Sequence, residues 1–217
     1  SQEDAAKQAA LLGVRYDVIP IEPMYEATVQ QLQPIFEDKP ADVTEENIQA
    51  RCRGLLLMAI SNKTGRMLLT TGNKSEMAVG YATLYGDMAV GFAPIKDCSK
   101  TMVFRLARYR NSIGEAIPGR VITRPPSAEL RPDQKDSDSL PDYDVLDPIL
   151  EAFIEDDLSV AEITAHGFDH DTVLRVLEMV KRNEYKRRQA PPGVRISRRA
   201  FGRDWRYPIT SGYKFPT

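Results

Sequence analysis

The sequence has little cysteine and little histidine, with two of each among 217 residues. So few cysteines favour a reducing compartment over secretion. Long apolar runs are also missing, since the longest, residues 55–60, is far shorter than the ~20 residues of a membrane helix. The first residues are polar and acidic, which does not fit a signal peptide. We therefore expect a cytoplasmic protein with no membrane span.

Composition and charge are those of a globular protein with an uneven charge distribution. Apolar residues make up 42% and charged residues 28%, and the net charge is −2. Residues 129–157 hold 11 acidic and 2 basic residues, whereas residues 181–206 hold 10 basic and 2 acidic ones. The whole chain is thus not a nucleic-acid binder on charge alone, although its basic tail could contact phosphate.

Hydrophobic periodicity predicts helices and short strands in alternation. A first helix ends at Gly13, and Thr44 is the expected N-cap of the most clearly patterned helix. The apolar end of that helix, residues 54–60, is expected to be buried. The predicted elements are a strand at 16–21, a helix before residue 42, a helix at 45–61, a strand at 67–71 and helices at 75–84 and 99–110. This alternation favours an α/β fold with a parallel sheet covered by helices.

The second half of the chain changes in character. Residues 118–148 combine six prolines with Asp, Ser and Gln, which is typical of a loop. Two helical stretches follow at about 147–165 and 170–186. Residues 189–217 are rich in Pro, Gly and Arg, so we expect an extended basic tail.

The segment around Gly72 joins a predicted strand to a predicted helix. Thr71 at the strand end and the helix N-terminus after it would suit a phosphate or carboxylate. Asn73 and Glu76 have the spacing of a capping box, and that alone would explain both residues. The spacing leaves both interpretations open.

Three further patterns are compatible with a binding site. Asn47 and Arg51 project from one helix face, although such a pair is often only a solvated face. Lys100 follows a glycine-bearing loop at 85–91 that allows close backbone approach, yet neither GxGxxG nor a Walker motif is present. The basic run 181–188, which includes Lys186, is either a solvated helix end or an anion site.

Taken together, these segments resemble the synthetase domain of NAD synthetase, within the N-type ATP pyrophosphatase superfamily. The resemblance rests on residues 46–111, with LTTGNKSE and YGDMA, on RPPSAEL at 124–130 and on NEYKRRQAPPG at 183–193. ISRRAFGRDWRYPI at 196–209 is similar to the glutamine-dependent bacterial type. The resemblance implies an adenine nucleotide alpha-hydrolase-like fold.

Two features of this family have no counterpart in the sequence. The phosphate-binding motif SGGxDS does not occur in the 217 residues, and neither does a glutaminase domain. Residues 1–217 are therefore expected to be the C-terminal portion of the synthetase domain of a longer protein. The chain by itself is expected to be inactive.

The resemblance implies the ATP-dependent amidation of deamido-NAD to NAD through an acyl-adenylate, with ammonia from glutamine. It implies Mg²⁺, ATP as co-substrate, pairing into a homodimer or higher homo-oligomer, and a lid at 118–148. The implied site residues are Thr71, Lys100 and Ser127 for ATP, Glu76 for Mg²⁺ and substrate, Asn47, Arg51, Asp87 and Lys186 for deamido-NAD, and Lys186 also for catalysis.

Two alternatives remain at this point. One is another adenylating ATP pyrophosphatase, of the GMP or asparagine synthetase type, although LTTGNKSE followed by YGDMA is not expected there. The other is a non-catalytic assembly module whose basic tail binds a partner or RNA.

Overall fold

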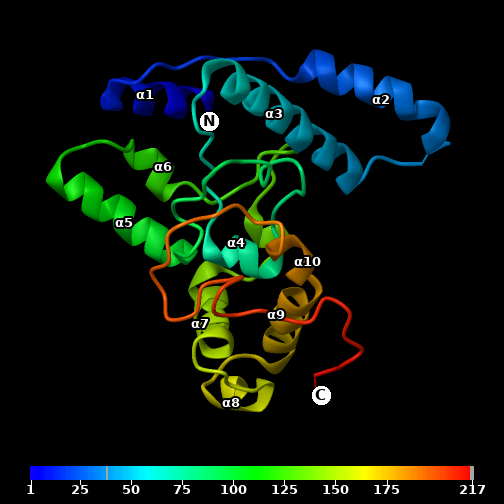
Figure 1. Cartoon of the computed structure of the whole chain (residues 1–217). Coiled ribbons are helices and arrows are strands. Elements are labelled where there is room, and N and C mark those ends of the chain that lie inside the picture. The colour runs from blue at the N-terminus through cyan, green and yellow to red at the C-terminus, as the bar shows by residue number, and fades with distance from the viewer. Residues whose placement is uncertain (38, 216–217) are drawn as a thin grey trace.

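The computed structural model describes residues 1–37 and 39–215, which form helices joined by irregular segments. In Figure 1, α1, α2, α3, α5 and α6 spread across the upper part of the molecule, and α7 to α10 cluster below, with α4 between them. The helices are α1 (Gln2–Leu12), α2 (Glu22–Phe36), α3 (Val43–Thr64), α4 (Lys74–Val79), α5 (Lys100–Ile113), α6 (Gly119–Thr123), the 3₁₀ turn η1 (Asp136–Asp138), α7 (Tyr143–Ile154), α8 (Val160–Ala165), α9 (His170–Arg182) and α10 (Glu184–Arg187).

Local sequence signals set several helix ends. Gly13 ends α1 in the left-handed conformation at φ 64°, as predicted. The prediction that Thr44 caps α3 is wrong. Asp42 is the N-cap, because its Oδ1 accepts from the Thr44 N–H at 2.7 Å and its own N–H donates to Glu45 Oε2 at 2.7 Å.

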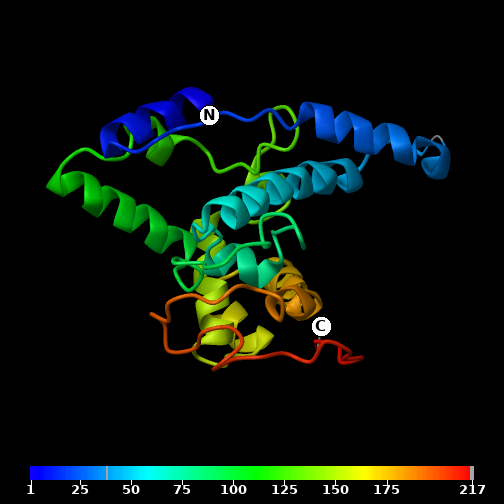
Figure 2. The same ribbon diagram turned by 45° about the horizontal axis from the view of Figure 1, so that its top comes forward.

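The apolar end of α3 is not buried in this chain, contrary to the prediction. Leu55, Leu57 and Ile60 keep 61%, 46% and 40% of their surface exposed. Figure 2 shows α2 running beside α3. No helix in the described residues is apolar over a length that would cross a bilayer.

Strand pairing is sparse. Two isolated parallel bridges, Leu69 with Phe92 and Phe201 with Trp205, are the pairings of strand type within residues 1–37 and 39–215. The predicted strand at 67–71 thus survives as one bridge, supported by the Thr70 N–H donating to the Phe92 carbonyl at 3.0 Å. The predicted strand at 16–21 is wrong, because this segment is irregular and forms no strand pairing with the described residues.

The apolar core surrounds α4 in the lower cluster. The side chains of α9 that face it recur at three- and four-residue spacing, and all are fully buried. They are Val173, Val176, Leu177 and Val180. Ala78 of α4 and Leu146 and Ile149 of α7 meet them and are also 0% exposed. The predicted helix 170–186 is α9 followed by α10, and the predicted 147–165 is divided into α7 and α8.

The acidic and basic stretches of the sequence meet in the fold. Tail arginines pair with the acidic end of α7 and the residues after it, as Arg198 does with Asp156 and Arg199 with Asp157. The buried Asp97 carboxylate accepts from the Ile196 and Ser197 N–H groups, both at 2.7 Å. Burial raises the pKa of Asp97, but these hydrogen bonds outweigh it and the net pKa is lowered. The irregular tail is therefore fastened to the core.

The predicted loop 118–148 is partly helical. It contains α6 and η1, and α7 begins within it at Tyr143, so its C-terminal boundary is wrong. Pro148 lies inside α7 on its exposed side. The central part packs beneath α3, where the Gln49 side chain donates to the Leu130 carbonyl at 3.0 Å.

Replacing Gly80 with alanine is expected to cost clearly more stability than replacing Gly13. Both glycines end a helix with positive φ, at 72° and 64°. A Cβ at Gly80 would lie 2.0 Å from Asn183 Cγ, whereas a Cβ at Gly13 would meet nothing within 4 Å. The left-handed conformation costs about 1 kcal/mol at both positions, and the clash adds ~1–3 kcal/mol at Gly80. Urea unfolding of the two variants measures the difference, and equal losses would contradict the close contact.

Candidate active site

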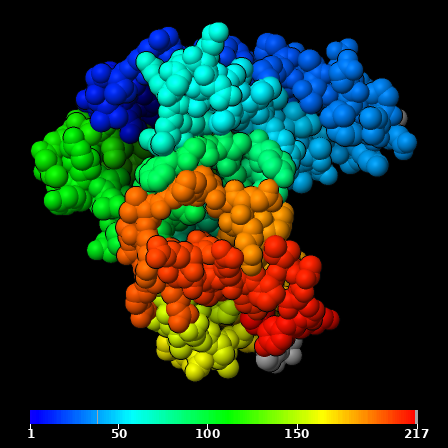
Figure 3. Space-filling view, in the orientation of Figure 1, coloured from blue at the N-terminus to red at the C-terminus, as the bar shows by residue number. Residues whose placement is uncertain are grey.

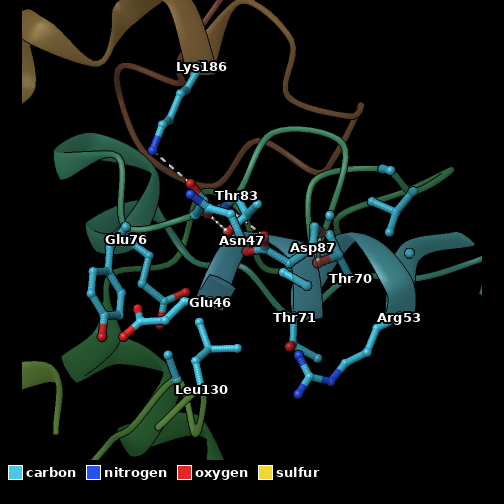
Figure 4. A pocket seen from close by; sticks show the side chains of 18 of the residues that line it. Glu46, Asn47, Arg53, Thr70, Thr71, Glu76, Thr83, Asp87, Leu130 and Lys186 are labelled. Carbon is cyan, nitrogen blue, oxygen red and sulfur yellow. Dashed lines mark hydrogen bonds between the residues drawn. The ribbon is translucent and has the colours of Figure 1, made fainter. Parts of the chain in front are cut away.

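A pocket of about 560 Å³ opens between α3, the extended segment 68–71, α4 and the turn that follows α4. Figure 4 shows its side chains converging from these segments and from Lys186. Every site residue expected from the sequence lines this pocket except Arg51. These lining residues are Asn47, Thr71, Glu76, Asp87, Lys100, Ser127 and Lys186. The fold thus brings together positions that are far apart in the chain.

Arg51 lies outside the pocket, at an exposed position from which its Nε donates to the Leu84 carbonyl at 3.3 Å. The pocket-facing stripe of α3 follows helical spacing through Glu46, Ala50, Arg53 and Leu57. Arg53 is therefore the arginine of α3 that faces the pocket. The periodicity of this stripe is the signal that could have identified Arg53 from the sequence.

The N-terminus of α4 combines a helix cap with a charged pair. Glu76 N–H donates to Asn73 Oδ1 at 3.0 Å and Asn73 N–H donates to Glu76 Oε2 at 3.3 Å, which confirms the capping box. Lys100 Nζ donates to the other carboxylate oxygen, Glu76 Oε1, at 2.8 Å. Both charged side chains are 18% exposed. The cap therefore leaves Glu76 facing the pocket beside a cation.

The turn after α4 carries a second polar group. Thr83 donates from its hydroxyl to Asn47 Oδ1 at 2.9 Å and from its backbone N–H to Asp87 Oδ1 at 2.6 Å (Figure 4). Loss of hydration raises the pKa of Asp87, while the Thr83 N–H and Lys186 act in the opposite direction. Thr83 belongs to no pattern that the sequence made visible, because its two partners come from separate segments.

Small residues let this turn approach α3. A Cβ on Gly86 would lie 2.9 Å from Ala50 Cβ, and one on Gly54 would lie 3.0 Å from the Gly86 carbonyl oxygen. The close backbone approach expected at Gly86 is confirmed. It brings Asp87 next to Asn47 on one wall of the pocket.

Lys186 points into the protein and not into solvent. Its Nζ donates to the Gly80 and Ala82 carbonyls at 2.7 and 2.8 Å. Partial burial lowers the pKa of Lys186, and the charge of Asp87 opposes that change. A third N–H of the ammonium is left for the pocket that Lys186 lines. The interpretation of the whole basic run as a solvated face is therefore wrong at this residue.

Three further residues of this region, Asp136, Tyr143 and Tyr81, were not identified from the sequence. Asp136 is 4% exposed and accepts from the Tyr143 hydroxyl at 2.7 Å, while its Oδ1 has no partner in the described part of the chain. Burial, and next to it the charge of Asp136, raises the pKa of Tyr81. The unpartnered oxygen of Asp136 is available to a hydrogen-bond donor on a ligand in the pocket that it lines.

The family model described as NAD synthase matches residues 1–190. The chain belongs to the NAD synthase family. The glutamine-dependent NAD(+) synthetase of Acinetobacter baylyi is 59% identical over 216 residues, an alignment that covers 99% of this chain and 40% of that protein. The chain thus spans about two fifths of that relative.

Solved structures agree with this NAD synthase assignment. The glutamine-dependent NAD+ synthetase of Acinetobacter baumannii, solved with ADP, is 53% identical, with a TM-score of 0.57 over 100% of this chain and 39% of its own. That of Cytophaga hutchinsonii is 25% identical, with a TM-score of 0.79 over 97% of this chain and 36% of its own. These neighbours confirm the α/β, adenine nucleotide alpha-hydrolase-like fold class, although strand pairing in the described residues is limited to bridges.

Proposed function

We propose that this chain carries part of the site at which a longer protein amidates deamido-NAD to NAD at the expense of ATP. The observation that supports this is the pocket itself. It gathers residues from all three motif regions that resemble the family, namely LTTGNKSE with YGDMA, RPPSAEL and NEYKRRQ.

In the first step the nicotinate carboxylate attacks the α-phosphorus of ATP, and pyrophosphate leaves with the electron pair of the broken P–O bond. Lys100 and Ser127 would bind phosphate oxygens, and Thr71 would contact ATP. Lysine and hydroxyl groups suit this task because negative charge builds up on the departing pyrophosphate. In the second step ammonia attacks the acyl carbon, and AMP leaves.

The substrate's nicotinate end would lie against Asn47, Asp87 and Lys186. Lys186 has one N–H left after its two carbonyl contacts, and this N–H would face the carboxylate that becomes adenylated. Arg51 stays a prediction as a deamido-NAD ligand, but from its position it would have to move to reach the pocket. The loop at 118–148 lines the pocket through Ser127 and Leu130, which fits a lid over the bound substrates.

Glu76 fits a role in holding Mg²⁺. Within residues 1–37 and 39–215 no three His, Cys, Asp or Glu side chains gather around one point. Mg²⁺ commonly binds to one or two carboxylates together with substrate phosphates. The half-buried Glu76 carboxylate lies beside Lys100, which is assigned to the ATP phosphates, and therefore fits this type of coordination. When bound, the ion would neutralise phosphate charge.

The remaining partners follow from the same proposal. Ammonia would come from glutamine through a glutaminase domain of the longer protein, and the protein would act in the cytoplasm as a homodimer or higher homo-oligomer. A nucleic-acid partner is disfavoured, because Arg198 and Arg199 of the tail are engaged with Asp156 and Asp157.

Supplying the full-length protein with deamido-NAD, ATP, Mg²⁺ and ammonium is expected to give NAD, AMP and pyrophosphate in equal amounts. Chromatography of the nucleotides and a pyrophosphate assay measure them. Xanthosine monophosphate and aspartate in place of deamido-NAD test the other adenylating types. Turnover of either, or binding of RNA with no nucleotide turnover, would replace this proposal.

A further inference from the structure

The C-terminal tail covers two buried cations at opposite ends of α4. At the N-terminal end, Lys74 Nζ donates to Ser197 Oγ at 2.6 Å and to the Arg199 carbonyl at 2.8 Å. At the C-terminal end, the guanidinium of Arg187 lies over the rings of Phe201 and Trp205, 5.2 and 5.5 Å from their centroids. Figure 3 shows the tail, in orange and red, arching in front of the recessed α4 region. We call residues 196–205 the tail strap.

Arg187 connects this strap to the last turn of α4. Its Nη1 donates to the Ala78 carbonyl at 2.6 Å, its Nη2 to the Val180 carbonyl at 2.5 Å and its Nε to Glu184 Oε2 at 3.0 Å. Arg187 is 4% and Glu184 2% exposed. A buried guanidinium with a carboxylate and two carbonyls in fixed directions has one geometry available to it.

Neighbouring residues of the NEYKRRQ motif donate to the backbone carbonyls that follow Ala78 in the chain. Asn183 Nδ2 donates to the Val79 carbonyl at 2.9 Å, and Lys186 holds the Gly80 and Ala82 carbonyls. A helix leaves its last carbonyls without intrahelical partners, and here side chains of one motif occupy them in sequence. The path of the chain from Gly80 to Thr83 is thereby fixed from outside the helix.

That path determines where two pocket groups lie. Thr83 comes next in the chain, and its contacts to Asn47 and Asp87 form the wall assigned above to the nicotinate half of the substrate. Within the described residues, Thr71, Lys100 and Ser127, assigned to ATP, form no hydrogen bond or ion pair with Arg187 or the tail strap. A change at Arg187 should therefore affect one substrate far more than the other.

We propose that Arg187 is a positioning residue. Held by Glu184 and by the rings of Phe201 and Trp205, it fixes the end of α4 so that Thr83 and Asp87 are in register for the deamido-NAD half of the pocket. The tail strap is thus a support of the binding site and not a free basic tail. The role in substrate binding depends on the proposed function, whereas the fixing of the turn does not.

The test compares Arg187→Lys with Arg182→Met in the full-length protein. A lysine keeps the charge but cannot reach Ala78, Val180 and Glu184 together. The matched control removes an arginine of α9 that is 79% exposed and lies 3.8 Å from Glu178, outside the tail strap. For Arg187→Lys we expect KM for deamido-NAD to rise at least tenfold, with KM for ATP and kcat within about threefold; the control should leave all three within twofold.

Hydrogen exchange of the peptide covering residues 80–88 gives a readout that needs no turnover. Exchange there is expected to be faster in Arg187→Lys than in the parent or in Arg182→Met. Trp205→Leu removes one ring that packs on Arg187 and leaves the Arg187 hydrogen bonds in place, so it should also speed exchange at 80–88. In the double variant Arg187→Lys with Trp205→Leu, the increase should be smaller than the sum of the two single increases, because both changes act through Arg187.

Three outcomes would overturn the positioning role. The first is that Arg187→Lys changes neither KM for deamido-NAD nor exchange at 80–88. The second is that KM for deamido-NAD and KM for ATP rise equally. The third is that only kcat falls, in proportion to the fraction of unfolded protein. If the parent protein makes no NAD at all, the proposed function fails, and the exchange at 80–88 alone decides whether Arg187 fixes the turn.

Discussion

Glu76→Gln in the full-length protein is expected to slow adenylation of deamido-NAD by about a hundredfold while the protein stays folded. Glutamine keeps the size of the side chain and an oxygen for the Asn73 N–H, but it loses the charge that faces Lys100 and that a magnesium ion would need. Losing one preorganised electrostatic partner in a site that excludes water costs roughly 3 kcal/mol, or about a factor of 100 in rate. Pyrophosphate release at saturating Mg²⁺ measures it.

A second capping box supplies the control for this experiment. Ser159 and Glu162 form the same reciprocal pair at the start of α8, away from the pocket residues. Glu162→Gln should lower stability by about 1 kcal/mol or less, as caps do, and leave adenylation unchanged. If Glu76→Gln gave the same small loss and full activity, Glu76 would be a capping residue only.

Lys186→Met in the full-length protein is expected to lower kcat/KM for deamido-NAD at least tenfold. A positive charge directed at the substrate's acidic end in a desolvated site is worth about 3 kcal/mol, which sets an upper range of roughly a hundredfold. Charge alone predicts almost no change in stability. The structure changes that expectation, because the Gly80 and Ala82 carbonyls would lose their donor. A loss of about 1–2 kcal/mol follows, or a few degrees in Tm.

The control must be a lysine or arginine that only adds charge to the surface. Lys181 is unsuitable, since its Nζ lies over the rings of Tyr213 and Phe215, 5.8 and 5.7 Å from their centroids. Arg182 is 79% exposed, with a loose contact of 3.8 Å to Glu178. Arg182→Met should leave both Tm and kcat/KM nearly unchanged. Similar kinetic losses from Lys186→Met and Arg182→Met would show that the basic run acts only through its overall charge.

Sequence motifs located the pocket better than they described its interior. Seven of the eight expected site residues line the pocket, yet the pair Asn47 and Arg51 separated, with Asn47 facing in and Arg51 out. Four residues apart on a helix means 40° of rotation, which is enough to move a side chain from the rim of a pocket to the surface. Thr83 carried no signal, because its partner Asn47 lies in a separate segment of the chain. Asp136 carried none, because its importance arises from its burial beside the pocket.

The sequence by itself determined the features that depend on a few neighbouring residues. Gly13 ended α1, Asn73 and Glu76 formed their capping box, and the motifs assigned the family. The helix end and the capping box follow from backbone conformation and hydrogen bonds that span at most about four residues. The family follows from the identity of the motif residues.

Only the tertiary structure decided which side chains are buried and where charges find partners. It left Leu55 and Ile60 exposed, joined the tail arginines to the end of α7, and turned Lys186 and Arg187 inward onto α4. Burial and pairing depend on whatever chain lies opposite, and residues about a hundred positions apart, such as Ala78 and Arg187, meet only once the whole chain has packed.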